Sequence, residues 1–367
     1  MSGQIRVSIN GRFLTQPMTG VQRYAHEIVN GIDGLLAHRS DIQVRLLTPP
    51  LSCPPPRLEH IRHVSVGRLK GHAWEQLELP QFVQDDVVFC PGNTAPLRLL
   101  WRGARMVVTV HDLSYLYFPD AYSRSFRMLY RAVIPQVLRR ASAVITVSES
   151  ERSAIIERYP EVKDRISVIA NGGLPSGVQP LPRKPPDEPF VLYVGSLSKR
   201  KNLSAMLDVA KRLADKRRFK FVFIGSTPLG LQRSVEHLPE SLKGKIMFAG
   251  QINDWTALCA HYSSAKCFFF PSLYESSGLP PMEAMGCGCP VLAAAIPALL
   301  ERCGDAAVYC DPNSVDDMTE KLEALVDNES LQQVLRERGY ARAREFSWNR
   351  SAGQTLSKIL EISQHEP

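Results

Sequence analysis

The chain has 367 residues, of which 44% are hydrophobic, and a formal net charge of +7 at pH 7. This length exceeds the usual size of a single hydrophobic core, so we expect two domains. The positive charge favours an anionic partner, and the lack of C2H2, RNP and helix-turn-helix signatures disfavours nucleic acid.

The sequence also predicts the compartment. No apolar run approaches the roughly 18 residues that a membrane-spanning helix needs. The chain passes from Met1 almost directly into the strand-like run Ile5–Ile9, which leaves no room for a signal peptide. Eight cysteines without C-x-x-C spacing fit buried, reduced thiols better than zinc ligands or disulfides. We therefore expect a cytoplasmic protein.

Short apolar runs alternate with amphipathic stretches along the first half of the chain. This alternation is typical of α/β folds with a parallel sheet. The runs that we predict to be strands are Ile5–Ile9, Gln43–Leu47, His63–Val66, Val87–Cys90, Met106–Val110, Ala143–Val147 and Ile166–Ile169.

A candidate ligand-binding turn follows the first of these strands. Gly20 lies just before an amphipathic stretch, Gln22–Ile32, that predicts a helix. A glycine there lets a ligand approach the backbone, and the helix N-terminus attracts an anion. An ordinary strand-to-helix turn is the alternative.

His111 is a second candidate, because it directly follows the expected strand Met106–Val110. Ligands of doubly wound sheets bind at the carboxyl ends of the strands. An imidazole at this edge could donate to a sugar hydroxyl or to a phosphate oxygen that gains charge. A structural hydrogen bond is the alternative.

The stretch Tyr122–Ala141 combines five arginines with an apolar face. A basic amphipathic helix of this kind can rest on anionic lipid and bring a lipid-linked acceptor to the site. Pro135 is expected to interrupt the helix. A solvated surface helix that covers the domain core is the alternative.

Residues 179–189 include five prolines among eleven residues and are predicted to form a linker. Beyond them the alternation restarts, so the simplest assembly is two doubly wound domains in tandem with a ligand cleft between them. The strands expected in the second half are Phe190–Val194, Phe219–Ile224, Lys245–Ala249, Cys267–Phe270, Val291–Ala294 and Ala307–Tyr309.

A group of cations follows the first strand of the second half. After the small residues Gly195 and Ser196 come Lys199, Arg200 and Lys201, just before an expected helix. A strand, a small-residue turn and cations in this order predict a phosphate clamp with Lys201 as its main cation. Solvated loop charge is the alternative, above all for Lys199.

Two carboxylates eight positions apart, Glu275 and Glu283, are the most informative pair in the sequence. Glu275 lies in a loop with Ser276 and Ser277, and we expect Glu283 in the first turn of a helix that begins after Gly278. A helix N-terminus suits a diphosphate, and carboxylates accept hydrogen bonds from sugar hydroxyls. For Glu283, stabilisation of the helix dipole alone is the alternative.

Metal-binding patterns are missing from the sequence. No Asp-x-Asp occurs, and no carboxylate–histidine cluster has metal-ligand spacing. We therefore expect neither a metal nor another cofactor, and cations with helix dipoles would neutralise a leaving diphosphate instead.

Together these motifs resemble glycosyltransferase family 4, a retaining family with the GT-B fold of two Rossmann-like domains. The resemblance runs from Asn10–Leu14 and Thr19–Tyr24 to Phe346–Trp348, and the E-x7-E pattern with its internal Gly-Leu-Pro-Pro is its most specific part. Trp74–Gln76 with Leu79–Pro80 is similar to bacterial mannosyltransferase-like members that act in O-antigen or exopolysaccharide synthesis.

The resemblance implies a domain division. Residues 1–178 would form an acceptor-side Rossmann-like domain, and residues 190–348 would form the domain that binds the sugar nucleotide. The C-terminal helix, residues 349–364, is expected to pack back onto the first domain.

The resemblance also implies roles for single residues. Glu275 would hold hydroxyls of the donor sugar, Lys201 the diphosphate, and His111 would touch the sugar near the reacting carbon; these three are the expected catalytic residues. Glu283 would hold the ribose, and Gly20 would give the diphosphate backbone room. The other residues expected to bind the donor are Ser196, Ser276, Ser277, Gly278 and Leu279.

Two positions depart from the family pattern. Family members often have arginine after the glycine matched by Gly195, where this chain has Ser196. The usual glycine and phenylalanine after the first glutamate are Ser276 and Ser277 here. The donor sugar therefore cannot be derived from the motif, and GDP-mannose is expected first and a UDP-sugar second.

The resemblance further implies transfer with retention of anomeric configuration, by front-face attack in which the leaving diphosphate accepts the proton of the acceptor. A lipid-linked glycan is the expected acceptor, with peripheral contact at the cytoplasmic face of the inner membrane. One alternative is a non-catalytic nucleotide-sugar-binding partner of an assembly complex. The other is a nicotinamide-dependent dehydrogenase, which the missing G-x-G-x-x-G fingerprint disfavours.

Overall fold

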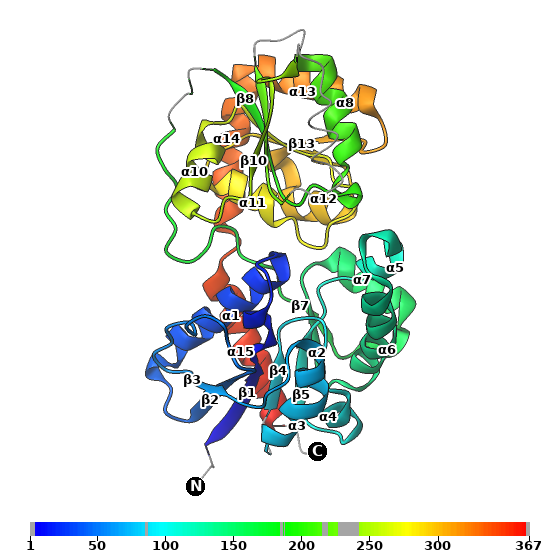
Figure 1. The fold of residues 1–367 in the computed structure, drawn as a ribbon. Coiled ribbons are helices and arrows are strands. Elements are labelled where there is room, and N and C mark those ends of the chain that lie inside the picture. Colours follow the sequence, from blue (N-terminus) through cyan, green and yellow to red (C-terminus); the bar gives the residue numbers. More distant parts are fainter. Residues whose placement is uncertain are drawn as a thin grey trace. The chain divides into compact units, whose positions relative to one another are not determined.

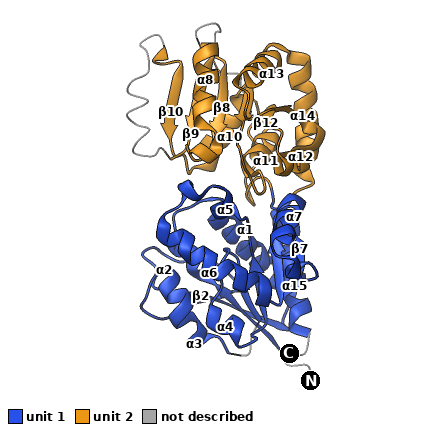
Figure 2. Ribbon diagram, turned by 90° about the vertical axis from the view of Figure 1, so that its right-hand side faces the viewer, with its two compact units in different colours: residues 1–172, 347–367 blue, residues 173–346 orange. Residues whose placement is uncertain are grey.

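The chain folds into two compact units, each built around one parallel sheet (Figures 1 and 2). The computed structural model describes residues 4–84, 87–183, 186, 188–214, 219–226 and 242–364. Unit 1 consists of residues 1–172 and 347–367, and unit 2 of residues 173–346. The proline-rich segment 179–189 belongs to unit 2, and its described residues form neither helix nor strand.

The sheet of unit 1 has seven parallel strands in the order β3-β2-β1-β4-β5-β6-β7. The chain order reverses between β1 and β4, so the topological switch point lies at the carboxyl ends of these two strands. The central strands are buried at every position, as expected when helices cover both faces. The strands are β1 (Ile5–Asn10), β2 (Ile42–Thr48), β3 (Arg62–Ser65), β4 (Val87–Cys90), β5 (Met106–Thr109), β6 (Ala143–Thr146) and β7 (Ile166–Val168).

The C-terminal helix of the chain, α15, belongs to unit 1 and packs against α1 and against strands β4 to β6 (Figure 1). Gly31 on α1 makes this packing close, because a Cβ atom there would lie 2.5 Å from Cβ of Ala352 on α15. A π-helical turn, Trp74–Glu78, follows α2. The helices are α1 (Gly20–Leu35), α2 (Gly71–Ala73), α3 (Leu79–Phe82), α4 (Leu97–Trp101), α5 (Ser114–Tyr117), α6 (Arg124–Arg140), α7 (Glu149–Arg158) and α15 (Trp348–Gln364).

The sheet of unit 2 has six parallel strands in the order β10-β9-β8-β11-β12-β13, and its switch point lies between β8 and β11. The strands are β8 (Phe190–Val194), β9 (Lys220–Ile224), β10 (Ile246–Gly250), β11 (Cys267–Phe270), β12 (Val291–Ala294) and β13 (Ala307–Cys310). The helices are α8 (Leu203–Ala214), α10 (Trp255–Ser264), α11 (Leu279–Gly286), α12 (Pro297–Cys303), α13 (Val315–Asp327) and α14 (Glu329–Arg344).

Every strand expected from the sequence forms, with its ends within one residue of those expected. Both sheets are parallel and both are doubly wound, so the predicted fold class is confirmed. The apolar runs were informative because strands buried on both faces need apolar side chains at nearly every position.

Pro135 does not interrupt α6, contrary to the expectation from the sequence. The helix runs from Arg124 to Arg140 with the proline inside it. A proline in a helix interior costs about 3 kcal/mol. Val133, Ile134 and Val137 are buried in the core of unit 1, and burying an aliphatic side chain contributes about 1.5–3 kcal/mol. The combined burial of these three side chains offsets the cost of the proline, so the helix continues through it.

All eight cysteines are free. Seven are buried, as expected for structural thiols, and burial raises the pKa of Cys303, for example, to about 12. The expectation of burial is wrong for Cys53, which is exposed in the segment between β2 and β3. That segment has no strand pattern to bury it.

Candidate functional site

The candidate donor site lies at the switch point of the unit 2 sheet. The neighbouring strands β8 and β11 end at Val194 and Phe270, and the loops that follow them carry Lys201 and Glu275. At a switch point the loops leave in opposite directions and open a crevice for a ligand. The topology thereby brings together two residues that are 74 positions apart in the sequence.

Lys201 and Glu275 form a buried ion pair, with Lys201 Nζ donating a hydrogen bond to Glu275 Oε1. Arg200 Nη1 lies 3.9 Å from the other carboxylate oxygen, Oε2. Burial alone would raise the pKa of Glu275, but the charges of Lys201 and Arg200 outweigh it and lower that pKa below the usual value. The carboxylate is therefore ionised at neutral pH and holds the lysine ammonium in place.

Asn202 fixes the turn that carries Lys201. Its φ angle of 63° is in the left-handed region, which asparagine tolerates better than most residues. Its side-chain amide donates to the carbonyl oxygens of Pro271 (3.1 Å) and Pro312 (2.6 Å). Lys201 Nζ also lies 5.1 Å from the ring centroid of Phe270. The loops after three strands therefore hold the position of the lysine.

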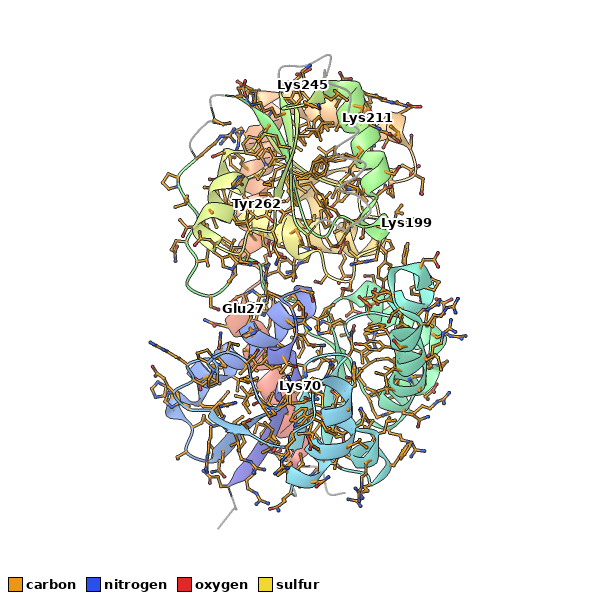
Figure 3. The ribbon with its side chains drawn as sticks, in the orientation of Figure 1. Glu27, Lys70, Lys199, Lys211, Lys245 and Tyr262 are labelled. Atoms are coloured by element: carbon orange, nitrogen blue, oxygen red, sulfur yellow. The ribbon has the colours of Figure 1, made fainter. Side chains whose placement is uncertain are left out.

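Arg200 was expected only as one of three cations in the phosphate clamp, with no role of its own. Its guanidinium donates to the carbonyl oxygen of Tyr274 (3.1 Å) and lies close to Glu275. The signal was present, since Lys199, Arg200 and Lys201 follow one another. Sequence alone does not say which of three consecutive cations a tight turn directs inward. Lys199, labelled in Figure 3, is exposed.

Gly278 is the N-cap of α11, as expected, and only glycine fits there. Its φ angle is 59°, and a Cβ atom would lie 2.7 Å from Cδ2 of Leu299. Leu279 begins the helix, but Pro280 and Pro281 follow it and have no N–H group. The helix N-terminus therefore offers fewer free N–H donors to a diphosphate than we expected.

Glu283 lies in the second turn of α11, and the expectation of the first turn is wrong. The influence of the helix dipole falls off within the first turn, so dipole stabilisation does not explain this residue. Its side chain is buried, and Oε2 accepts a hydrogen bond at 2.9 Å from the hydroxyl of Tyr262 on α10, which is labelled in Figure 3. Holding α10 against α11 is now the structural alternative to binding a ribose.

The other expected donor-binding residues of unit 2 lie in the same two loops. Ser196 follows β8 and is exposed, and its carbonyl oxygen accepts from the Tyr193 hydroxyl at 2.9 Å. Ser276 is half-buried and Ser277 is buried, both directly after Glu275. The loops that hold the ion pair therefore also present hydroxyl groups.

His111 lies in unit 1, after β5, and is buried. Its Nε2 lies 2.9 Å from the carbonyl oxygen of Pro91, so Nε2 carries the proton and donates. Burial lowers the pKa of His111, which keeps the ring neutral at pH 7. With Nε2 engaged, the ring has Nδ1 left as a hydrogen-bond acceptor.

Gly20 also lies in unit 1 and is exposed. It is the first residue of α1, which begins two residues earlier than the expected Gln22. Thr19 is the N-cap, but its hydroxyl bonds the side chain of Gln22 and leaves the backbone N–H groups of the first turn uncapped by it. Those groups are what would attract an anion.

A second polar cluster, which was not predicted from the sequence, lies at the switch point of the unit 1 sheet. Glu75 is fully buried and accepts hydrogen bonds from Asn10 Nδ2 (2.7 Å), Arg12 Nε (3.1 Å) and Thr94 Oγ1 (2.7 Å). His72 Nδ1 lies 3.1 Å from Glu75 Oε2, the oxygen that also accepts from Thr94. Glu75 lies in the segment Trp74–Gln76. That segment was used in the sequence analysis only for its similarity to bacterial mannosyltransferase-like family members.

The ionisation of Glu75 follows from these contacts. Burial raises its pKa, but the charge of Arg12 and hydrogen bonds from His72 and Thr94 outweigh burial and lower the pKa to about 2. Glu75 and Arg12 are therefore both charged and fully enclosed, as a hydrogen-bonded pair.

Within the ranges described above, no group of three or more His, Cys, Asp or Glu side chains is arranged to hold a metal ion. The carboxylates of both clusters instead contact cationic side chains.

Two family models match the chain: Glycosyltransferase Family 4 over residues 18–172 and Glycosyl transferases group 1 over residues 180–342. The chain is 27% identical to the O-antigen chain mannosyltransferase B of Escherichia coli, covering 93% of this chain and 96% of that protein. Its fold is similar to sucrose-phosphate synthase from Thermosynechococcus elongatus, with a TM-score of 0.74, 20% identity and coverage of 98% and 99%. It is also similar to HepE of Anabaena in complex with UDP-glucose, with a TM-score of 0.66, 16% identity and coverage of 96% and 99%.

Proposed function

This chain belongs to glycosyltransferase family 4 and has the GT-B fold, and from this premise we propose that it transfers mannose from GDP-mannose to a growing, lipid-linked cell-surface glycan. The relative in O-antigen synthesis, which matches nearly the whole chain, supports mannose. A UDP-sugar is the second candidate, because the similar HepE structure holds UDP-glucose. The family excludes the dehydrogenase alternative.

The observation that carries the proposal is the buried ion pair of Lys201 and Glu275 at the switch point of the unit 2 sheet. Glu275 accepts hydrogen bonds from hydroxyls of the donor sugar, while Lys201 and Arg200 bind the diphosphate. The bond between sugar and phosphate then lies beside both groups. Glu283 binds the ribose, and the loop from Ser276 to Leu279 supports the sugar.

The reaction is a substitution at the anomeric carbon with retention of configuration. The acceptor hydroxyl attacks from the face of the leaving group, the bond from carbon to the phosphate oxygen breaks, and the proton passes to that oxygen. The protein contributes positioning and charge rather than a nucleophile. Lys201 and Arg200 neutralise the departing diphosphate, so the reaction needs no divalent metal.

Donor binding and transfer test this proposal together. We expect GDP-mannose to raise the melting temperature more than UDP-glucose, since a ligand at 100 times its Kd stabilises by about 2.7 kcal/mol. Transfer to a lipid-linked glycan should persist in EDTA and give an α-linked mannose, read from the one-bond carbon–hydrogen coupling. Binding with neither transfer nor donor hydrolysis would instead support the non-catalytic alternative.

A basic surface on unit 1 supports membrane contact. The exposed side of α6 carries Arg124, Met128 and Arg131, and Met128 is 73% exposed. Trp101 on α4 is 60% exposed, and its indole Nε1 lies 3.5 Å from Gln136 on α6. Aromatic and basic side chains together favour the interface of an anionic bilayer. No described helix is both long and apolar enough to cross a membrane. The contact that we propose is peripheral, at the cytoplasmic face of the inner membrane.

Vesicle co-sedimentation tests this contact. We expect the protein to bind vesicles rich in phosphatidylglycerol and to dissociate from them at high salt. It should not bind phosphatidylcholine vesicles. Replacing Arg124 and Arg131 by glutamate should abolish binding, and Trp101→Ala should weaken it. Arg338→Glu, an exposed arginine in unit 2, is the control for changed charge. Binding that is independent of lipid charge and salt would contradict the proposal.

A further inference from the structure

Unit 1 carries a row of aromatic rings that the proposed transfer reaction does not use. Tyr122 stacks on Phe126, with centroids 4.9 Å apart, and Phe126 stacks on Tyr130 at 3.8 Å. The edge of His72 meets Tyr130 at 6.1 Å, with an angle of 89° between the rings. Tyr122 and Phe126 are partly exposed, so these two rings reach the surface of unit 1.

A polar group lies at each end of the row. At one end is the imidazole of His72, whose Nδ1 lies 3.1 Å from Glu75 Oε2 and whose Nε2 lies 3.4 Å from Arg12 Nη1. At the other end Asp112 Oδ1 accepts from the backbone N–H and the hydroxyl of Ser114, and that hydroxyl also bonds Tyr122. Among the described residues, the hydrogen bonds to the Asp112 carboxylate are both made to Oδ1, which leaves Oδ2 available. It is therefore an acceptor that a ligand can use.

The scaffold behind this row is rigid. Glu75 is bonded on all sides by Asn10, Arg12, Thr94 and His72, which fixes the orientation of the imidazole. A site that is held before its ligand arrives loses less entropy when it binds.

Asn93, just beyond the carboxyl end of β4, supports the segment that follows β5 at the same edge of the sheet. It is a non-glycine residue with a φ angle of 59°, and its side chain accepts from the backbone N–H of His111 at 2.7 Å.

We propose that the acceptor shelf, defined as His72, Asp112, Tyr122, Phe126 and Tyr130, binds a neutral pyranose, the terminal sugar of the glycan acceptor. This inference rests on the proposed function. A pyranose has an apolar face of C–H groups that packs against the exposed parts of Tyr122 and Phe126, and hydroxyls that donate to the carboxylate of Asp112.

The charges on the shelf select against the other part of a lipid-linked acceptor, its phosphate. The carboxylate of Asp112 would repel an anion placed beside it, whereas the charge of Glu75 is already balanced by Arg12. A neutral sugar meets no such repulsion. The shelf therefore fits the glycan end of the acceptor.

The test measures how two ligands bind to the 367-residue chain. Binding of α-mannotriose is measured by saturation-transfer NMR, and binding of GDP by calorimetry. Asp112→Asn and Phe126→Leu should each weaken mannotriose binding about 10-fold or more and leave GDP binding within about twofold. Lys201→Ala should weaken GDP binding and leave mannotriose binding unchanged. The control is Asp120→Asn, because Asp120 is an exposed carboxylate in the 3-10 turn Pro119–Ala121. It should change neither mannotriose binding nor GDP binding.

Melting temperatures equal to that of the unchanged chain would show that both shelf variants are folded. The inference is overturned if mannotriose does not bind at millimolar concentration, or if both shelf variants bind it as the unchanged chain does. Failure of the proposed function looks different: GDP-mannose is neither bound nor transferred, while mannotriose binding still depends on Asp112.

Discussion

Replacing Lys201 by alanine lowers kcat about 10²–10³-fold, the largest effect that we expect from any single substitution in unit 2. The lysine is buried, so its charge acts on the departing diphosphate with little screening by water. The charge on the leaving group is greatest in the transition state, so the loss falls on kcat more than on KM. Initial rates with GDP-mannose and a lipid-linked glycan measure it.

The matched control is Lys199→Ala, on the same turn. Lys199 is exposed, so its removal changes the local charge by the same amount without reaching Glu275. We expect its kcat to stay within about twofold of the unchanged chain, as for a screened surface charge. Equal losses in both variants would mean that general positive charge, and not the placed ammonium, drives the reaction.

Damage to the fold can be separated from damage to the chemistry. In the Lys201→Ala chain, Glu275 keeps Arg200 as a neighbouring cation 3.9 Å away. The buried carboxylate is therefore not left wholly uncompensated, and the melting temperature should fall only moderately. Unfolding of the variant at assay temperature would be a structural effect, which a thermal melt detects directly.

The strands could be predicted because burial acts on every residue of a central strand. Val87–Cys90 and Cys267–Phe270 are apolar throughout and lie at the centres of their sheets. The carboxyl ends of these strands are then the natural places for a ligand, and Glu275 lies in the loop that follows the second of them.

Contacts between distant loops could not be predicted in the same way. Asn202 reaches the carbonyl oxygens of Pro271 and Pro312, and its sequence neighbours contain no sign of this. The burial that carries α6 through Pro135 likewise depends on strands earlier and later in the chain. Local propensity predicted a break, and tertiary packing prevented it.

Glu75 shows why a buried charge is hard to recognise in sequence. Its pattern, a glutamate between Trp74 and Gln76, is equally compatible with an exposed helix face. Arg12 lies 63 positions away and becomes its partner only once β1 and the π-helical turn are in place. The pairing is a property of the fold and not of either segment.

Replacing Glu75 by glutamine lowers the free energy of unfolding of unit 1 by about 3–5 kcal/mol. The amide leaves Arg12 buried without a counter-charge. Its NH₂ group also replaces a carboxylate oxygen that accepts hydrogen bonds from the neighbouring donors. Urea unfolding followed by tryptophan fluorescence measures the loss, since the fully buried Trp74 is adjacent to the substitution. The control is Glu161→Gln, which removes the exposed pair with Arg139 and should change little.

The pH dependence identifies the cause. The pKa of Glu75 falls from 4.5 to about 2 on folding, so its contribution is complete above about pH 4.5 and is lost as the pH falls toward 2. Glu75→Gln should lack this part of the acid-induced loss. The double variant with Arg12→Met should lose less than the sum of the two single losses, because the pair is coupled. Additive losses and an unchanged acid profile would show that the carboxylate stabilises unit 1 by packing and not by its charge.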